Sequence, residues 1–567
     1  MKSRRWLVLL GCVFAVVLVA GLLAACESGT TSTSGDEATT TSVESSVPRS
    51  VLECPQGPQS ADTPQYGGTL VLIHDRPPSN IGAFFLKTGF ADVQLARYAL
   101  ENLVGLDAQG NPVPQLATSW DVDDVANTIT FHLREGVKFH DGTDFNADAV
   151  KWNLEMFKNG EKKDLEDIES IDVDAADPYT IVLHMTKIDV NFVQMLSFTC
   201  AGKMISPAAY ELYGEEGIKL HPVGTGPFEF ESYEPSISLT YKAFADYWQE
   251  GLPYLDGVEI KFVTDEVTKY TSYKNGEANA LYGVGIADAA ELEALGHAIS
   301  VRTMTLWGIA GDMKSADSPF ANLEVRQGIA YAINRDRAVE GVYEGFNVAT
   351  DQLAIPDGQA WNPAIAGYAY DPVKAAELLS RNGITPETPW NVTFTYVASP
   401  LENDLWTLVQ EDLAAVGVNL NLNGTNYAGW MEKATKGASG ELVNFALSYN
   451  GIEVQLGNSL TGNLSKDRTW YPDIVLSNAF NAAYNGLSAA KDRDELETLY
   501  EALNKIAIDD DCVVVMVLGV RNRVAKAPDL HDYGFGELTT GEFLPERAWL
   551  SGASNPGVTT TVGASTN

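Results

Sequence analysis

The residue with the plainest covalent chemistry is Cys26, a thiol at the end of an apolar run close to the N-terminus. Basic side chains precede the apolar stretch 6–23, and the tetrapeptide Leu23-Ala24-Ala25-Cys26 completes it. This order is typical of a bacterial lipoprotein signal, in which the cysteine is acylated and becomes the first residue of the mature chain. We therefore expect residues 1–26 to be a lipoprotein signal peptide with its lipobox, and Cys26 to carry a lipid anchor.

Two alternatives remain for this segment, a plain secretion signal and an uncleaved membrane helix. The adjacent arginines Arg4 and Arg5 leave the general and the twin-arginine export routes open. Three cysteines then belong to the exported body, namely Cys54, Cys200 and Cys512. Because disulfides persist outside the cell and three is an odd number, at most one bridge is expected.

No motif for catalysis or cofactor binding occurs in the chain. The sequence contains no Gly-x-Ser-x-Gly turn, no His-Glu-x-x-His helix, no Gly-x-x-x-x-Gly-Lys-Ser/Thr phosphate loop and no Gly-x-Gly-x-x-Gly dinucleotide loop. Asp172-Val-Asp174 begins like a calcium loop, but the glycine and the glutamate that such a loop needs further on are missing. We expect no enzymatic activity, no cofactor and no metal site.

The charge balance excludes one class of partner. The chain has 38 Lys and Arg against 76 Asp and Glu, a net charge of -38. Such a chain repels a phosphate backbone, so nucleic acid is not an expected partner. The sign of a small ligand is not determined by the net charge, because a pocket can be locally basic inside an acidic shell.

The composition places tethers at both ends of a folded body. Residues 28–50 contain 13 Ser or Thr residues and almost no large apolar ones, so we expect 27–60 to be a tether. The tail 551–567 has the same character and is expected to be disordered. With 567 residues, the chain is long enough for several packed units.

The body between the tethers alternates strand and helix patterns. Short runs of β-branched and aromatic residues predict strands at Thr69–Ile73, Thr128–Leu133, Thr180–His184 and Val392–Val397. Apolar residues at helical spacing predict helices at Asp144–Met156, Leu323–Tyr343, Pro372–Ser380, Trp406–Val416 and Glu495–Ile506. This alternation predicts an α/β protein.

Four ordered segments carry a resemblance to a known family. The first marker is Gln115-Leu-Ala-Thr-Ser-Trp120 with Thr130-Phe-His-Leu-Arg134, Gly136-Val-Lys-Phe-His-Asp-Gly142 and Ala147-Asp-Ala-Val-Lys-Trp152. The second is Pro222-Val-Gly-Thr-Gly-Pro-Phe228 with Asp246-Tyr-Trp248, the third is Glu324-Val-Arg-Gln-Gly-Ile-Ala-Tyr-Ala-Ile-Asn-Arg335, and the fourth is Asp371-Pro-Val-Lys-Ala-Ala-Glu-Leu-Leu379 with Gly383. From about Gly67 to about Trp549 the chain resembles family 5 extracellular solute-binding proteins, the peptide, nickel and oligosaccharide receptors of ATP-driven importers. The marker residues themselves are expected to hold the fold rather than contact ligand.

The resemblance implies a two-lobed, periplasmic-binding-protein-like clamshell of type II with an extra subdomain in lobe I. Lobe I is expected to comprise 60–303 and 522–550, with the extra subdomain at about 103–206, and lobe II to comprise 304–521. The chain is expected to cross between the lobes near Thr303–Trp307 and Val517–Arg523. Since Cys54 and Cys200 would both belong to lobe I, we favour a bridge between them.

The resemblance also implies a binding site in the cleft between the lobes. Peptide receptors of this family hold the ligand's amino group with a lobe II carboxylate, and the comparable stretch here is Phe445-Ala-Leu-Ser-Tyr-Asn-Gly-Ile-Glu453, which lacks the family's Asp-Pro ending. Glu453 is expected to replace that aspartate, although an exposed loop glutamate is the alternative. The expected ligand-binding residues are Trp307, Trp430, Tyr449, Asn450, Glu453 and Trp470 in lobe II, and Phe84 and Phe85 in lobe I.

The function implied is that of a substrate-binding lipoprotein of an ABC-type importer. We expect a monomer on the extracellular face of the bacterial membrane, or on its periplasmic side where an outer membrane is present. The chain would capture a small solute of the peptide class and present it to ABC permease subunits. Alternatives are the same fold binding an oligosaccharide or a nickel chelate, and a solute receptor used for signalling.

Overall fold

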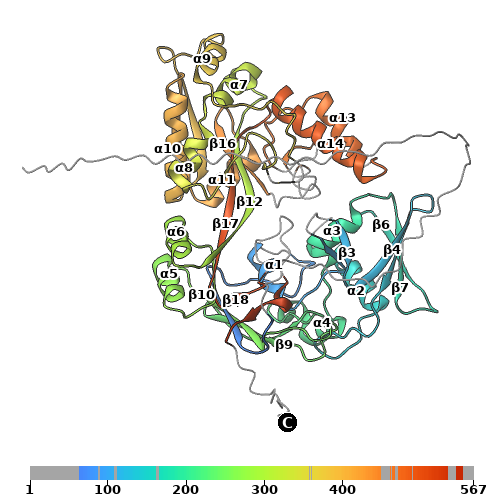
Figure 1. The fold of residues 1–567 in the computed structure, drawn as a ribbon. Helices are drawn as coiled ribbons and strands as arrows, with labels where there is room; N and C mark the ends of the chain where they lie inside the picture. Colours follow the sequence, from blue (N-terminus) through green and yellow to red (C-terminus); the bar gives the residue numbers. More distant parts are fainter. Residues whose placement is uncertain are drawn as a thin grey trace, which may run out of the picture. The chain divides into compact units, whose positions relative to one another are not determined.

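The computed structural model describes residues 63–86, 90–107, 111–160, 165–356, 358, 361–448, 460, 463–465, 470–487, 489–533 and 544–552. Helices and strands alternate along the chain, which confirms the predicted α/β class (Figure 1). The expected signal, tether and tail, with Cys26 and Cys54, lie outside these residues.

The largest sheet has eleven strands and joins segments from both halves of the chain. Its order is β15 (Val418–Thr425), β14 (Trp390–Val397), β16 (Leu442–Ser448), β12 (Ala298–Gly311), β17 (Val515–Lys526), β11 (Ala280–Tyr282), β1 (Thr69–His74), β10 (Gly257–Phe262), β9 (Ser238–Ala243) and β8 (Phe228–Glu234), with β13 (Val348–Ala349) on β17. The long antiparallel strands β12 and β17 therefore connect its two ends.

We use lobe I for the body that contains β1 and β8 to β11. It also holds a four-stranded sheet, two small pairs of strands and six helices among the described residues. The four-stranded sheet has the order β4 (Ala117–Asp123), β5 (Thr128–Leu133), β7 (Thr180–Met185) and β6 (Ile168–Val173), and the small pairs are β2 (Val104–Leu106) with β3 (Pro112–Pro114) and β18 (Leu530–His531) with β19 (Trp549–Leu550). The helices are α1 (Phe90–Ala96), α2 (Ala147–Lys158), α3 (Phe192–Phe198), α4 (Pro207–Ile218), α5 (Glu266–Lys274) and α6 (Ile286–Ala294).

We use lobe II for the body that contains β13 to β16. Its helices among the described residues are α7 (Leu323–Ala332), α8 (Arg335–Tyr343), α9 (Pro372–Ser380), α10 (Pro400–Ala414), α11 (Tyr427–Lys436), α13 (Asn478–Leu487) and α14 (Arg493–Lys505). Short helical turns at Cys200–Gly202, Pro319–Ala321, Ile506–Asp510 and Pro545–Arg547 complete the two lobes.

The two lobes have separate hydrophobic cores. The core of lobe I includes Phe131 and Tyr241, and that of lobe II includes Phe394 and Trp406. A third, smaller cluster around Leu281 packs against the lobe I half of β17. Because large apolar side chains are buried in each body, each lobe has its own source of stability.

The strands that connect the lobes change partners at one point. In β12, Thr303 pairs with Arg521 of β17 and Thr305 pairs with Val520, so Met304 is an extra residue with no partner in the ladder. On the lobe I side of this bulge, β17 pairs with β11. On the lobe II side, β12 pairs with β16, starting at Thr305. A bulge bends and twists a strand locally. The change of partners falls inside the predicted crossing segment 303–307, while the lobe boundaries stay predictions.

The predicted helix at Leu323–Tyr343 is two helices in the structure. α7 ends where Ile333 takes an extended conformation, and Asn334 then caps α8 by accepting a hydrogen bond from the backbone N–H of Arg337. Asparagine is a strong N-cap because its side chain satisfies one of the unpaired N–H groups of the first turn. Apolar periodicity continues across this break, which is why the pattern alone predicted one helix.

The two glycines of the second marker lie in close contact with the backbone at Ala99. A Cβ atom on Gly224 would lie 2.3 Å from the carbonyl oxygen of Ala99, and one on Gly226 would lie 2.7 Å from the carbonyl carbon of the same residue. The N–H of Gly226 donates to that carbonyl at 3.0 Å. Only glycine permits this approach, so the marker has a packing role.

The third marker supplies two buried guanidinium groups, one that joins α7 to the segment before β17 and one that joins α8 to β17 itself. Arg326 donates to the backbone carbonyls of Phe320, Ala321, Asp511 and Cys512. Arg335 donates to the carbonyls of Ala330, Tyr368 and Met516. A guanidinium loses its hydrogen bonds to water when it is buried. Hydrogen bonds to these backbone carbonyls take their place.

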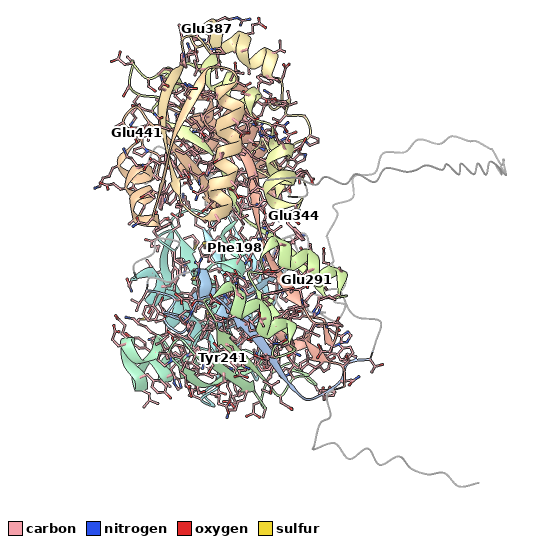
Figure 2. The ribbon with its side chains drawn as sticks, turned by 90° about the vertical axis from the view of Figure 1, so that its left-hand side faces the viewer. Phe198, Tyr241, Glu291, Glu344, Glu387 and Glu441 are labelled. Carbon is pink, nitrogen blue, oxygen red and sulfur yellow. The ribbon has the colours of Figure 1, made fainter. Side chains whose placement is uncertain are left out.

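Acidic side chains lie on the outside of both lobes. Glu291, Glu344 and Glu387 are exposed, while Tyr241 is buried in lobe I (Figure 2). These three carboxylates are therefore solvated by water, whereas Glu101 and Glu546 are buried in lobe I. Within the described part of the chain, no helix combines the length and the apolar character that crossing a membrane requires.

Candidate functional site

The predicted lobe II aromatic residues form a cluster around Trp430. The ring of Trp430 lies 5.6 Å from that of Trp470 and 5.4 Å from that of Tyr427, measured between centroids. Trp430 itself is only 6% exposed, and its indole N–H donates to the carbonyl of Asn444 at 2.9 Å. This hydrogen bond and burial are typical of a core residue.

Trp307 differs from Trp430 in its exposure. It lies on β12 between Ala446 of β16 and Leu518 of β17, three residues beyond the bulge, and is half-buried against the lobe II core. Among the aromatic residues predicted to contact ligand, Trp307 is partly exposed and also lies near the point where β12 and β17 change their neighbouring strands. Tyr449, Asn450 and Glu453 lie outside the described residues, so their roles stay predictions.

The predicted lobe I residues Phe84 and Phe85 are buried at 3% and 6% exposure. The ring of Phe85 meets the edge of Tyr210 at 5.7 Å, and the Phe84 ring lies 6.0 Å from the ammonium of Lys203. Both side chains pack in the lobe I core. Contact of either with ligand stays a prediction.

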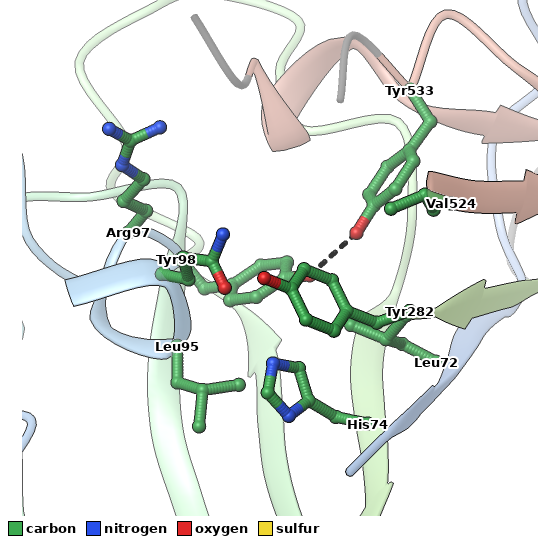
Figure 3. Close-up of a pocket in the computed structure, with 9 residues that line it drawn as sticks. Leu72, His74, Leu95, Arg97, Tyr98, Tyr282, Val524 and Tyr533 are labelled. Atoms are coloured by element: carbon green, nitrogen blue, oxygen red, sulfur yellow. Dashed lines mark hydrogen bonds between the residues drawn. The ribbon is translucent and has the colours of Figure 1, made fainter. Parts of the chain in front are cut away.

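A small cavity in lobe I, lined by both apolar and polar side chains, lies beside the strands that connect the lobes (Figure 3). Its walls come from the ends of β1, β11 and β17, from α1 and from the segment after β18. The lining residues are Leu72, His74, Gln94, Leu95, Arg97, Tyr98, Tyr282, Val524 and Tyr533. The cavity leaves about 20 Å³ for the centres of water molecules, which is room for a small polar group and not for a whole peptide.

His74 forms the floor of this cavity. It is 2% exposed, and its ring stacks on Tyr282 with 4.3 Å between centroids and 14° between planes. Burial lowers the pKa of His74 to about 4, and the nearby carboxylate of Asp75, 3.3 Å from Nδ1, opposes this shift only in part. The imidazole is therefore neutral at pH 7.

The opposite wall contains tyrosines and amphipathic side chains. The hydroxyls of Tyr98 and Tyr533 lie 3.0 Å apart and share a hydrogen bond (Figure 3). The side chain of Gln94 is a hydrogen-bond neighbour of His74, and this contact opposes the lowering of the histidine pKa by burial.

Basic groups gather behind the cavity. Lys203 is buried, and its pKa is lowered to about 7, first by burial and then by the positive charge of Arg97. Arg97 itself lines the cavity.

His74, Gln94, Arg97 and Tyr282 were not among the site residues predicted from the sequence. One signal was available, because His74 ends an apolar strand and is followed by two charged residues. Polar residues at the ends of buried strands frequently line ligand sites in α/β proteins. Nothing in the sequence indicated that Tyr282 would stack on that histidine.

The predicted bridge between Cys54 and Cys200 also stays a prediction, since Cys54 lies outside the described residues. Cys200 is half-buried in the turn after α3. Cys512 is not in a disulfide and is fully buried in lobe II. Among the residues that the structure describes, no group of three His, Cys, Asp or Glu side chains could hold a metal ion.

Comparison with solved structures shows the fold. The chain matches NikA from Brucella suis in complex with Fe(III)-EDTA at a TM-score of 0.74 and 20% identity, over 85% of this chain and 99% of that one. It matches the dipeptide-binding protein from Pseudoalteromonas sp. SM9913 in complex with Met-Leu at 0.69 and 18%, over 85% and 100%. These matches confirm the predicted two-lobed fold.

Comparison of sequences shows the family. The model of bacterial extracellular solute-binding proteins, family 5 Middle, matches residues 111–454. The glutathione-binding protein GsiB of Escherichia coli K12 is 31% identical over 405 residues, covering 69% of this chain and 75% of that protein. GsiB of Shigella dysenteriae matches at the same identity and coverage. This chain belongs to the family 5 bacterial extracellular solute-binding proteins.

Proposed function

We propose that this chain is the lipid-anchored substrate-binding subunit of an ABC-type importer and that it captures a peptide or peptide-like solute. The observation that carries the proposal is the bulge at Met304, where the connecting strands pass from lobe I partners to lobe II partners. A hinge between two independently packed lobes is what a receptor that closes on its ligand requires.

Closure would follow from differential affinity. A solute that contacts both lobes binds the closed form more tightly than the open form and so shifts the population toward closure. Moving a two-state equilibrium from 1:99 to 99:1 needs about 5.5 kcal/mol of differential binding. Trp307, beyond the bulge, would contribute from lobe II, and the small cavity beside β11 and β17 would contribute from lobe I.

The relatives support the peptide class. The curated relatives above are described as glutathione-binding proteins, and one solved structure contains the dipeptide Met-Leu. Glutathione and a dipeptide share amide groups, an amino group and carboxylates. NikA, which has the same fold, was solved with the metal chelate Fe(III)-EDTA, so a chelate is an alternative ligand. An oligosaccharide is a second alternative.

Binding without catalysis is part of the proposal. The family to which the chain belongs is one of solute-binding proteins, a role that needs no active site. The sequence also contains none of the catalytic motifs named above. The proposed partners are ABC permease subunits, with the receptor acting as a monomer held at the outer face of the membrane by lipid on Cys26. Use of the same clamshell for signalling is the competing interpretation.

Native mass spectrometry of protein purified without denaturation tests the ligand class through any co-purified solute. Calorimetric titrations with reduced glutathione, Met-Leu, maltotriose and a nickel–histidine chelate then compare the classes directly. We expect one peptide-class ligand per chain, with a smaller radius of gyration in solution scattering when it is bound. Binding of maltotriose or the nickel chelate alone would overturn the peptide assignment. Uptake lost on deletion of the gene and regained with the wild-type chain separates import from signalling.

A further inference from the structure

A second cavity of lobe I lies beside helix α4. Its walls come from α4, from the first residues of β8, from the segment 140–143 and from the segment 221–223 at the start of the second sequence marker. It leaves about 290 Å³ for the centres of water molecules, against about 20 Å³ in the cavity around His74, and the two cavities share no lining residue. Because an apolar cavity of about 150 Å³ can hold a benzene ring, the α4 cavity has room for a ring-sized molecule.

One wall of the α4 cavity is a stack of three rings. The ring of His221 lies 4.1 Å from that of Tyr213 and 4.5 Å from that of Phe230, measured between centroids. Helix α4 is interrupted directly after Tyr213, where Gly214 takes a φ of 65° that favours glycine. Tyr213 remains 40% exposed, and the adjacent Leu212 is 74% exposed. The mouth of the cavity therefore offers aromatic and aliphatic surface that a ligand can bury.

The charged lining of the α4 cavity is acidic. Asp141 accepts hydrogen bonds from the backbone N–H of Thr143 at 3.0 Å, from the hydroxyl of Thr143 at 2.6 Å and from the hydroxyl of Ser206. These donors are neutral, and no ion pair joins Asp141 to another residue that the structure describes. The second carboxylate, on Glu229, lies 3.1 Å from the ammonium of Lys242, which is not a lining residue. The negative charge of Asp141 is thus left without a basic partner.

The two histidines of the lining add no positive charge at neutral pH. The backbone N–H of Gly224 donates to Nδ1 of His140 at 3.3 Å, so Nε2 carries the ring proton and donates to the carbonyl of Gly226 at 2.9 Å. Burial lowers the pKa of His140 to about 4 and also lowers the pKa of His221. Both rings are therefore neutral at pH 7 and above.

This combination of groups selects the chemistry of an occupant. The face of an aromatic ring carries partial negative charge and attracts a cation. A carboxylate without a basic partner also attracts a cation, and it donates no hydrogen bond to an anion. The ring wall adds contact area for an aromatic body, since rings stack on one another face to face or edge to face.

We propose that the α4 cavity is a second ligand site of this chain and that it binds an arylalkylamine, a primary ammonium group carried on an aromatic body. The aromatic body packs against the wall of Tyr213, His221 and Phe230, and the ammonium group lies at the carboxylate of Asp141. The site is separate from the binding of the transported solute, so the inference does not depend on the function proposed above.

The probe is 2-phenylethylamine, a cation at pH 7, with 2-phenylethanol as its neutral counterpart of similar shape. The full mature chain is labelled at histidine, and its ring signals, assigned with single His→Gln variants, are followed by NMR at constant pH and ionic strength. We expect the amine to shift the signals of His221 and His140 in a saturable way, with an affinity about tenfold above that of the alcohol. His132 and His184, on the four-stranded sheet, should not move. Absence of a shift, equal affinity for amine and alcohol, or equal shifts of all four histidines would overturn the proposal.

A pair of acidic variants tests the charge. Asp141→Asn keeps a carbonyl that can accept from Thr143 but removes the negative charge, so it should weaken amine binding about tenfold and leave alcohol binding unchanged. Glu231→Gln removes the same charge from an exposed position of β8 that does not line the cavity, and it should bind the amine like wild type. Undiminished binding by Asp141→Asn, or an equal loss in Glu231→Gln, would contradict the site. If Asp141→Asn does not fold, the comparison of amine with alcohol in wild type decides.

A pair of substitutions at Tyr213 tests the ring wall. Tyr213 is partly exposed, so both variants are expected to fold. Tyr213→Phe keeps the aromatic face and should retain amine binding, whereas Tyr213→Ala removes the face and should weaken it about fivefold. Equal affinity of Tyr213→Ala and wild type would overturn the placement of the aromatic body.

The ring signal of His74 distinguishes this site from the cavity of Figure 3. His74 lines that cavity and not the α4 cavity, so its signal should stay unchanged when 2-phenylethylamine saturates the shift of His221. The affinity for any peptide-class solute found by calorimetry should also stay within about twofold when the amine is present at saturation. A shift of His74 in place of His221, or competition between amine and solute, would mean that the amine enters the solute site and would defeat the proposal. Amine binding by a chain that binds no peptide would leave this inference standing and defeat the proposed function.

Discussion

The indole N–H of Trp248 reaches both carboxylate oxygens of Glu101, at 3.1 and 2.9 Å, across 147 residues of sequence. The hydroxyls of Thr225 and Tyr247 donate to the same carboxylate at 2.8 and 3.0 Å. Three residues of the second sequence marker therefore surround one buried acid. The marker holds lobe I together, which agrees with the expectation that such residues serve the fold.

Glu101→Gln should destabilise lobe I. The amide would present an N–H₂ toward groups that are themselves donors, and each buried donor left unpaired costs about 1–3 kcal/mol. Thermal and urea unfolding should show the loss, while glutathione affinity of the folded fraction should change little. Glu135→Gln, at an exposed position, is the control. Equal stability of Glu101→Gln and wild type would mean that the carboxylate is not needed for packing.

The buried acid Glu546 predicts a pH dependence of stability. Burial raises the pKa of Glu546 to about 7, with the charge of Glu101 adding to the shift and Arg547 opposing it. An acid with a raised pKa disfavours the folded state above that pKa, and the penalty disappears as the pH falls through 7 toward 4.5. Glu546→Gln should therefore be the more stable form at pH 8, by up to about 3 kcal/mol, and this advantage should shrink by pH 5.

The quantity to measure is the difference in stability between wild type and Glu546→Gln at each pH. Buried histidines titrate in an overlapping range, and their effect on stability changes with pH in the opposite direction. Burial lowers the pKa of both His74 and His140 to about 4. Their contribution to stability is present above pH 6.5 and is lost as the pH falls toward 4. Melting temperatures of wild type and Glu546→Gln from pH 5 to 8 give the comparison. A difference independent of pH would contradict a raised pKa.

Trp307 and Trp430 should respond differently to replacement by alanine. Trp307 is half-buried near the bulge, so Trp307→Ala should weaken ligand binding by about 1–3 kcal/mol with a small change in melting temperature. Trp430 is buried and hydrogen-bonded, so Trp430→Ala should cost about 3–5 kcal/mol of folding stability. Calorimetry beside a thermal melt measures both effects. Unchanged affinity in Trp307→Ala would remove it from the site.

The thiol of Cys512 should be inert in the folded protein. It is fully buried, and burial raises its pKa to about 11, so almost none is thiolate at pH 8. A thiol reagent such as DTNB should label it only after urea denaturation, and Cys512→Ser should lack that increment. Fast labelling of Cys512 in native protein would show that lobe II opens locally.

Anchoring through Cys26 is open to direct test. Cys26→Ala removes the acyl acceptor, so the chain should leave the membrane fraction and appear in the medium or the soluble extract. Wild type should stay with membranes through a high-salt wash, since lipid anchoring does not depend on charge. A variant that also resists the wash would show that another element holds the chain at the membrane.

Local pattern was enough to predict many of the elements. The run Thr128–Leu133 is a strand with those bounds, because its alternating apolar residues face the core on one side. The predicted helix at Asp144–Met156 begins later, at Ala147, because Asn146 caps it by accepting a hydrogen bond from the backbone N–H of Ala149. The helix buries Val150, Leu154 and Phe157, which recur at helical spacing. These features depend on neighbours a few residues away, which the sequence displays directly.

The sequence by itself determined the α/β class and the family, since periodicity and marker order are local properties. Only the tertiary structure decided which polar residues share a cavity. His74 and Tyr282 meet because β1 and β11 pair in the central sheet, and their stacking follows from that pairing. The burial of Trp430 and the partial exposure of Trp307 were decided in the same way, because burial depends on contacts between segments far apart in sequence.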